Sequence, residues 1–236
     1  MLCKSDARPG RRGERETMNS TGNSEKARTV EVGESRLEGL LTIPDNAKGL
    51  VIFAHGSGSS RLSPRNAYAA RALNGRALAT LQFDLLTEAE AADRGNVFDI
   101  PLLGRRVAET VRWAGTKPST AFLPIGLFGA STGAAAALTA AAALPELVMA
   151  VVSRGGRPDL AGPALDLVRA PTLLIVGGDD DIVIELNRRA LEMLACEKQL
   201  TIVPGATHLF EEPGTLDAVI VAAGDWFEHY LVKDKA

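Results

Sequence analysis

The chain has 236 residues, of which 46% are hydrophobic and 23% are charged, and its formal net charge is −3. This length and composition are typical of a single α/β domain with a sizeable core. The acidic balance offers no basic surface to nucleic acid or to an anionic membrane, so we expect neither as a partner.

Two cysteines, Cys3 and Cys196, are too few for a disulfide framework, which predicts a reducing, cytoplasmic location. The start of the chain mixes both charge signs with Gly, Pro and Ser and has no apolar signal segment. We therefore predict a disordered polar tail at 1–27, with Met18 as an alternative start, and one folded domain at 28–236. Polar residues and a proline interrupt the alanine-rich stretch 133–152, so no membrane span is expected.

Residues 29–44 alternate around a Gly33-Glu34 turn and predict a hairpin. Beyond it, apolar runs of strand length alternate with stretches of helical spacing. The predicted strands are 49–55, 77–84, 122–128, 147–153, 170–178 and 198–205, and the predicted helices are 63–76, 100–115, 134–147, 181–195 and 215–232.

This order of elements predicts an α/β fold: a mostly parallel sheet with helices on both faces and an antiparallel hairpin at its N-terminal end. The 81–101 excursion carries an acidic short helix and is expected to form one rim of a cleft. Only 154–171 separates two of the strands, which is too short for a separate lid domain.

The stretch GASTG, residues 129–133, joins a predicted buried strand to an alanine-rich helix. A serine in such a strand-to-helix turn is held in a strained backbone, and glycines two positions away on either side let neighbouring backbone approach closely. Ser131 is therefore a candidate nucleophile. A serine hydroxyl is a weak nucleophile at neutral pH, so it needs a base, and the base needs an orienting carboxylate.

Among the three histidines, His229 lies in a predicted helix and has the character of a surface or packing residue, and His55 precedes the nucleophile turn. In α/β hydrolases the order along the chain is nucleophile, acid, base, which selects His208. Three aspartates lie between Ser131 and His208, at 179–181. One suffices as the acid, since the others suit the first turn of the following helix, and the residues alone do not choose among them.

The loop FAHGSGSSR after the first parallel strand consists mostly of small residues and can supply a backbone N–H to a developing oxyanion. Ser57 is our candidate for that donor, and the residue after the nucleophile, Thr132, supplies the second N–H. The phosphate-binding patterns G-x-x-x-x-G-K-[ST] and G-x-G-x-x-G are both absent from the sequence.

The motifs HGSGSS, GASTG, GGDDDIV and GATHLFEEPG, in this order, resemble those of the small dienelactone-hydrolase-like members of the α/β-hydrolase superfamily. The resemblance covers about residues 28–232. It implies Asp180 as the acid, the N–H of Ser57 as an oxyanion donor, and a loop-shaping role for His55. Dienelactone hydrolases proper carry a cysteine at the nucleophile position, so Ser131 marks a serine variant and favours a general esterase.

The sequence thus predicts a serine hydrolase that cleaves small carboxylic esters through an acyl-enzyme, with Ser131, His208 and Asp180 as the triad. Neither a metal nor an organic cofactor is expected, the expected partner is a small-molecule ester, and no oligomeric state is predicted. Alternatives are hydrolysis of a dienelactone, lactone, thioester or amide by the same triad, or a non-catalytic protein that holds a small ligand on a hydrolase fold. Arg154 and Arg157 are candidates for contact with an acidic substrate or for surface salt bridges.

Overall fold

The computed structural model describes residues 27–232, so the predicted tail lies outside the described residues except for Ala27. The strands are β1 (Arg28–Val32), β2 (Leu37–Thr42), β3 (Gly49–Ala54), β4 (Leu78–Phe83), β5 (Ile125–Ala130), β6 (Val148–Arg154), β7 (Thr172–Gly177) and β8 (Lys198–Val203). The helices are α1 (Pro64–Asn74), α2 (Glu88–Ala91), α3 (Arg94–Val97), α4 (Ile100–Thr116), α5 (Thr132–Ala143), the 3-10 helix η1 (Pro158–Leu167), α6 (Asp181–Met193) and α7 (Thr215–Leu231).

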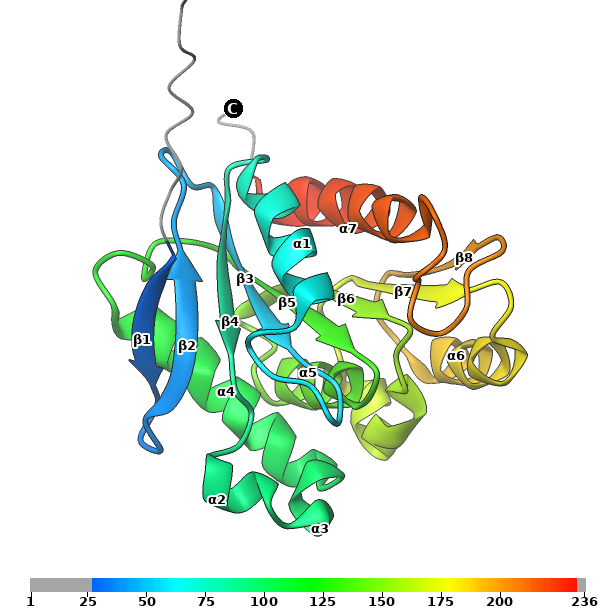
Figure 1. Cartoon of the computed structure of the whole chain (residues 1–236), viewed down its shortest axis with the longest axis horizontal. Helices are drawn as coiled ribbons and strands as arrows, with labels where there is room; N and C mark the ends of the chain where they lie inside the picture. Colours follow the sequence, from blue (N-terminus) through cyan, green and yellow to red (C-terminus); the bar gives the residue numbers. More distant parts are fainter. Residues whose placement is uncertain (1–26, 233–236) are drawn as a thin grey trace, which may run out of the picture.

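The strands form one sheet in the order β1-β2-β4-β3-β5-β6-β7-β8 (Figure 1). β1 pairs antiparallel with β2, and β2 pairs antiparallel with β4. From β4 to β8 every neighbouring pair is parallel. The predicted α/β fold with its N-terminal antiparallel hairpin is therefore confirmed.

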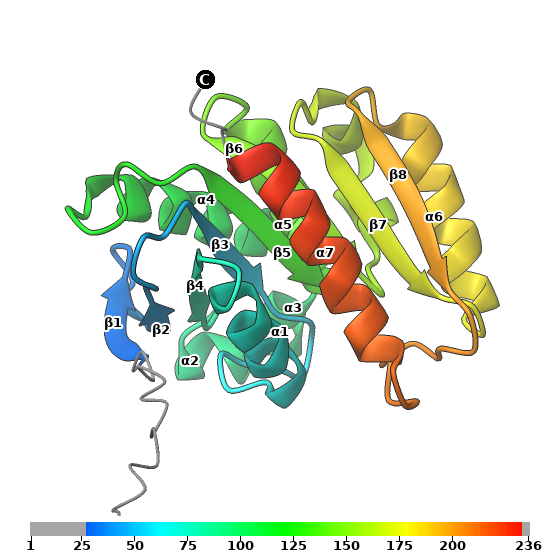
Figure 2. The same cartoon turned by 90° about the horizontal axis from the view of Figure 1, so that it is seen from above.

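Helices cover both faces of the sheet. Helices α1 and α7 pack on one face and contact each other, whereas α4, α5, η1 and α6 form a connected layer on the other (Figure 2). The central strands β3, β4 and β5 are buried along their whole length, which explains why β3 and β5 contain no polar side chain.

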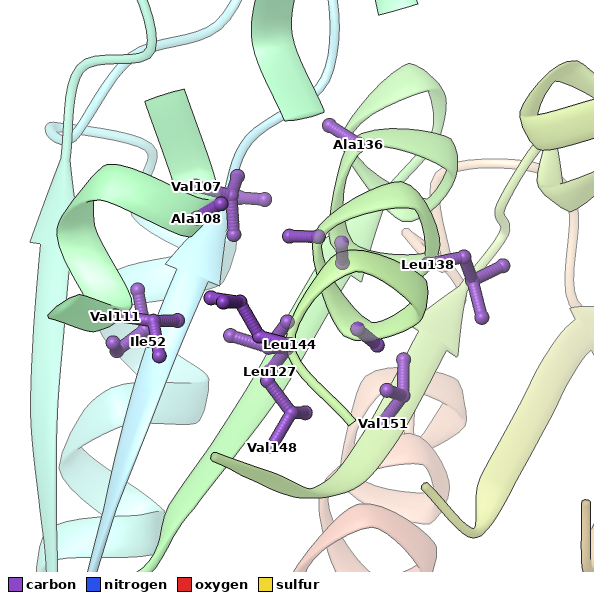
Figure 3. Close-up of a cluster of buried hydrophobic side chains, with 14 of the residues drawn as sticks. Ile52, Val107, Ala108, Val111, Leu127, Ala136, Leu138, Leu144, Val148 and Val151 are labelled. Carbon is purple, nitrogen blue, oxygen red and sulfur yellow. The ribbon is translucent and has the colours of Figure 1, made fainter. Parts of the chain in front are cut away.

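The core beneath α4 and α5 combines branched side chains of the sheet and of α4 with the alanines of α5. Figure 3 shows Val111 of α4 beside Ile52 of β3, and Leu127 of β5 near Leu144 and Val148. The alanines of α5 let it pack closely between α4 and η1. A Cβ added to Gly104 of α4 would lie 2.7 Å from the Thr139 Cγ2 atom of α5, so the glycine is what permits this approach.

Two predicted elements were misplaced at both ends. The strand expected at 122–128 begins at Ile125 and runs to Ala130, because residues 118–122 form a turn in which Phe122 is 71% exposed. The helix expected at 134–147 is α5, which begins at Thr132 and ends at Ala143, before Leu144 and Pro145. A proline ring clashes with a preceding helical turn, which accounts for the early stop.

The predicted loops meet at the carboxyl edge of the parallel strands. The segments after β3, β5, β7 and β8 carry the oxyanion-loop candidate, Ser131, Asp180 and His208, respectively. Between β6 and β7 lies only η1, so no separate lid domain is inserted between these two strands, as predicted. None of the helices in residues 27–232 has the length and apolar character needed to cross a membrane.

Candidate active site

Ser131 sits on a sharp turn between β5 and α5. Its backbone has φ 50° and ψ −124°, a conformation that costs a non-glycine residue about 1–3 kcal/mol, and its side chain makes no capping hydrogen bond. The flanking glycines allow this turn to form. A Cβ on Gly129 would lie 2.4 Å from Ala134 Cα, and one on Gly133 would lie 2.2 Å from the Ala54 carbonyl oxygen. The GASTG pattern thus supports a packed strand-to-helix turn that presents the serine.

Asp180 and His208 are in direct contact: the Asp180 Oδ2 atom lies 2.7 Å from His208 Nδ1. Asp180 follows β7 and His208 follows β8, and these strands are neighbours in the sheet. Gly177 at the end of β7 allows the two loops to touch, because a Cβ there would lie 2.3 Å from the Ala206 carbonyl oxygen. This contact fixes the imidazole so that Nδ1–H donates to the carboxylate and Nε2 is free to accept a proton.

The two other aspartates of the GGDDD stretch differ from Asp180 in burial. Asp179 and Asp181 are exposed, whereas the Asp180 side chain is only 16% exposed. Asp181 lies in the first turn of α6, where a carboxylate interacts favourably with the helix dipole. Of the three aspartates, the structure places Asp180 next to the histidine.

The end of β6 lies between the serine turn and the histidine loop. The Arg154 carbonyl accepts the Ser131 N–H at 3.4 Å, and a Cβ on Gly155 would lie 2.9 Å from the His208 carbonyl oxygen. Ser131 and His208 therefore lie on either side of this strand end. Among the described residues, the Ser131 hydroxyl makes no hydrogen bond. Bonds between nucleophile and base are often long in ligand-free enzymes and shorten when substrate binds.

The loop after β3 packs directly on the serine turn. A Cβ on Gly56 would lie 2.9 Å from Ser131 Cβ, so only glycine lets the loop come this close. The next residue, Ser57, donates its backbone N–H to the Thr132 Oγ1 atom at 2.9 Å. In residues 27–232 no atom accepts the N–H of Thr132, which opens α5. Both predicted oxyanion donors thus border Ser131, and one of them is already hydrogen-bonded.

His55 shapes this loop. Its Nδ1 atom lies 2.9 Å from the Gly56 carbonyl oxygen, and its Nε2 atom accepts the Leu85 N–H at 3.1 Å. The two bonds together require the tautomer that is protonated on Nδ1. Burial lowers the pKa of the His55 imidazole, so the ring stays neutral and ties the loop to the end of β4. The exposed His229 on α7 packs edge-on against Tyr230.

A cleft of about 610 Å³ opens beside the oxyanion loop. Apolar side chains from the 81–101 excursion and α4 form part of its wall, namely Leu85, Leu86, Ala91, Val97 and Leu103. Residues 55–61 and Thr132 line it as well, and the acidic helix α2 contributes Glu88. Ser131, Asp180 and His208 are not among its lining residues, so the cleft adjoins the serine turn through its neighbour Thr132. The predicted rim with a short acidic helix is confirmed.

An ion-pair network within this cleft was not predicted. The Arg61 backbone N–H donates to Asp84 Oδ1 at 2.7 Å, and the Arg61 guanidinium pairs with Asp84 and with Glu38. Asp84 directly follows β4 at the same sheet edge as the other loops, and this position in the sequence could have indicated that it lies near the site. The network neutralises the only arginine of the oxyanion loop and holds that loop against β2 and β4.

The two arginines after β6 differ in environment. Arg157 forms a two-bond ion pair with Asp159 on the surface, as the salt-bridge alternative predicted. Arg154 is only 8% exposed, packs its guanidinium over the Phe128 ring, and has a buried Nη1 atom without a hydrogen-bond partner. Burial lowers the pKa of the Arg154 guanidinium to about 10, and the nearby Arg65 cation lowers it as well. Folding therefore disfavours the protonated form of this side chain.

We predict that Arg154→Met raises the free energy of unfolding at pH 7 by about 1–3 kcal/mol, because an unpaired buried charge is replaced by an apolar side chain. The penalty is fully present below about pH 10 and fades as the pH rises above it, since the folded-state pKa is the lower one. Urea unfolding at pH 7 measures the change. Arg157→Met is the matched control and should change stability by less than about 1 kcal/mol. A loss of stability in Arg154→Met would contradict the inference that the buried Arg154 charge destabilises the fold.

The structure offers little for a metal. Within the described part of the chain, no three His, Cys, Asp or Glu side chains gather so that they could hold a metal ion. The polar groups that converge at the sheet edge are instead a serine, a histidine with its carboxylate, and backbone N–H groups. These are the groups that acyl transfer requires.

The chain is similar to several solved structures. A dienelactone hydrolase from Anabaena variabilis ATCC 29413 has a TM-score of 0.84 and 56% identity, with 88% of this chain and 98% of that chain covered. Est1E from Butyrivibrio proteoclasticus has a TM-score of 0.73 over 88% of this chain and 100% of its own. Its identity is 16%, so this second likeness concerns the fold alone.

Two curated proteins of Mycobacterium tuberculosis, from strains CDC 1551 and H37Rv, are 58% identical to the chain over 202 residues. Each is named as a candidate phosphoribosyl transferase. The match covers 86% of this chain and 46% of each relative, so the chain spans about half the length of these proteins. No protein-family model matches the chain.

Proposed function

Because the chain belongs to the dienelactone hydrolase family of α/β hydrolases, we propose that it is a serine hydrolase that cleaves small carboxylic esters. The observation that carries the proposal is the 2.7 Å contact between Asp180 Oδ2 and His208 Nδ1, at the sheet edge that also presents Ser131 on its strained turn. Orientation of a histidine by a carboxylate, close to a serine, is the arrangement that activates the hydroxyl.

In the proposed mechanism, His208 Nε2 takes the proton of Ser131 as Oγ attacks the ester carbonyl. The carbonyl oxygen becomes an oxyanion that lies between the Ser57 loop and the N–H of Thr132. Collapse of this intermediate breaks the bond to the alcohol, which leaves with the proton from His208. A water molecule then attacks the acyl-enzyme with His208 as the base, and the carboxylic acid and free Ser131 are regenerated.

The choice of a small ester rests on the nucleophile and the cleft. Dienelactone hydrolases proper resemble this chain but carry a cysteine where Ser131 stands, and a serine depends more on its histidine than a cysteine does. A cleft of about 610 Å³ has the size that ordinarily accommodates a small organic ligand. Its wall combines leucines with a neutralised Arg61, which suits an uncharged acyl or alcohol group.

The test is mass spectrometry of the intact protein after reaction with a small fluorophosphonate, with turnover of p-nitrophenyl acetate and butyrate followed in parallel. We expect one adduct, on the peptide that contains Ser131, and turnover that His208→Ala removes. A folded protein that forms no adduct and hydrolyses neither ester would instead favour the alternative of a non-catalytic ligand-binding protein. Full activity in His208→Ala would also refute the mechanism.

The transferase name of the longer Mycobacterium relatives concerns proteins of which this chain covers 46%. We assign hydrolase chemistry and not phosphoribosyl transfer to this chain, because the Asp180–His208 contact and the strained Ser131 turn at one sheet edge suit acyl transfer. A phosphoribosyl transfer assay with this chain should therefore yield no product.

A further inference from the structure

The hydroxyl group of Thr132 has no role in the mechanism above, yet it occupies the position where the oxyanion donors meet. Its Oγ1 atom accepts the Ser57 N–H at 2.9 Å. The same residue supplies the free N–H at the start of α5. The hydroxyl oxygen therefore lies between the oxyanion loop and the helix terminus, next to Ser131.

The geometry leaves the hydroxyl proton of Thr132 available. A hydroxyl carries one donor and two acceptor sites, and the Ser57 N–H uses one acceptor site. In the part of the chain that the structure describes, no atom accepts a hydrogen bond from Thr132 Oγ1. The side chain is only 5% exposed, yet Thr132 and Ser57 both line the cleft. The remaining donor site of the hydroxyl can therefore donate to a group bound in the cleft.

The Ser57 bond also holds the side chain in one rotamer. Threonine has two heavy atoms on Cβ, so rotation about χ1 is already restricted, and the bond selects the rotamer whose oxygen faces the loop. A donor fixed before the reaction needs no reorganisation when negative charge develops. Acceptance of the Ser57 N–H also polarises the hydroxyl and strengthens it as a donor.

We infer that Thr132 is a further catalytic residue, whose hydroxyl donates a hydrogen bond to the oxyanion together with its own backbone N–H. The Ser57 N–H then acts through Thr132 Oγ1 by holding and polarising it. No covalent bond to Thr132 forms, and its proton stays on Oγ1 throughout. This inference rests on the proposed function, because it requires an oxyanion at Ser131.

The test compares Thr132→Val, Thr132→Ala and Thr132→Ser with the wild type. Thr132→Val keeps the shape of the side chain and removes the donor, so we expect kcat to fall about 100-fold with little change in KM. A trifluoromethyl ketone, which forms a tetrahedral adduct with the serine, should bind more weakly by a similar factor. Thr132→Ala should show the same loss, and Thr132→Ser should recover most of it. Thr139→Val, on the same helix but facing Gly104 of α4, is the matched control.

A different result would overturn the inference. If the Thr132 hydroxyl only occupies the oxyanion position in the free protein, Thr132→Ala would vacate that position and raise kcat above the wild-type value. Equal turnover in Thr132→Val and the wild type would exclude a donating role. Wild-type adduct formation at Ser131 separates these outcomes from failure of the proposed function, in which the wild type itself would neither react nor turn over. If Thr132→Val does not fold, the comparison of Thr132→Ser with Thr132→Ala decides.

Discussion

Ser131→Ala is expected to lower kcat for p-nitrophenyl esters by about a million-fold and to abolish the fluorophosphonate adduct. Without the nucleophile, His208 and Asp180 have no hydroxyl to activate. In a serine hydrolase, removal of the serine therefore lowers kcat about as much as removal of the whole triad. What remains is the small rate enhancement due to binding and to the oxyanion donors. Turnover with purified protein, corrected for spontaneous ester hydrolysis, measures the effect.

The substitution should leave the fold intact. The Ser131 side chain makes no capping hydrogen bond, and alanine tolerates φ 50° no worse than serine does. The midpoint of thermal unfolding should therefore change little. Ser119→Ala, in the turn before β5, is a matched control that should keep full activity. Substantial turnover in folded Ser131→Ala would place the nucleophile elsewhere and would falsify the mechanism.

Much of the fold follows from the sequence because its elements are long and differ in pattern. An apolar run such as 49–55 is typical of a strand that is covered on both faces of a sheet, and β3 is such a strand. The start of β5 was misplaced because Phe122 is apolar but exposed, so hydrophobicity alone extended the strand into a turn. Where local chemistry is ambiguous, tertiary packing decides the boundary.

The candidate site was predictable to the extent that each residue follows a strand of the same parallel sheet. Strand ends of a parallel sheet meet at one edge, so Ser131, Asp180 and His208 could be expected to lie together. Two features depend on three-dimensional packing and have no local signature: the bond from Ser57 N–H to Thr132 Oγ1, and the burial of Arg154 without a partner. No spacing along the chain relates residues 57 and 132.

The second large effect that we predict is a fall in kcat of about ten-thousand-fold for Asp180→Asn, with Asp179→Asn and Asp181→Asn close to wild type. The Asp180 carboxylate accepts from His208 Nδ1, which leaves Nε2 free to take the serine proton. An asparagine amide can instead donate to Nδ1 and so favour the tautomer with its proton on Nε2, which cannot act as the base. Steady-state kinetics of the three variants on one ester measure the difference.

The three aspartates form a built-in control, because the substitution is the same and the positions are adjacent. Asp179 and Asp181 are exposed, so removal of either charge should change local stability only slightly. If Asp181→Asn were the damaging change, the carboxylate would have to leave the first turn of α6 to reach His208, and the acid assignment would be wrong. If all three variants were nearly fully active, the histidine would not depend on an aspartate in this loop. A loss confined to Asp180→Asn is the outcome that the 2.7 Å contact requires, because only that carboxylate can select the tautomer on which proton transfer from Ser131 depends.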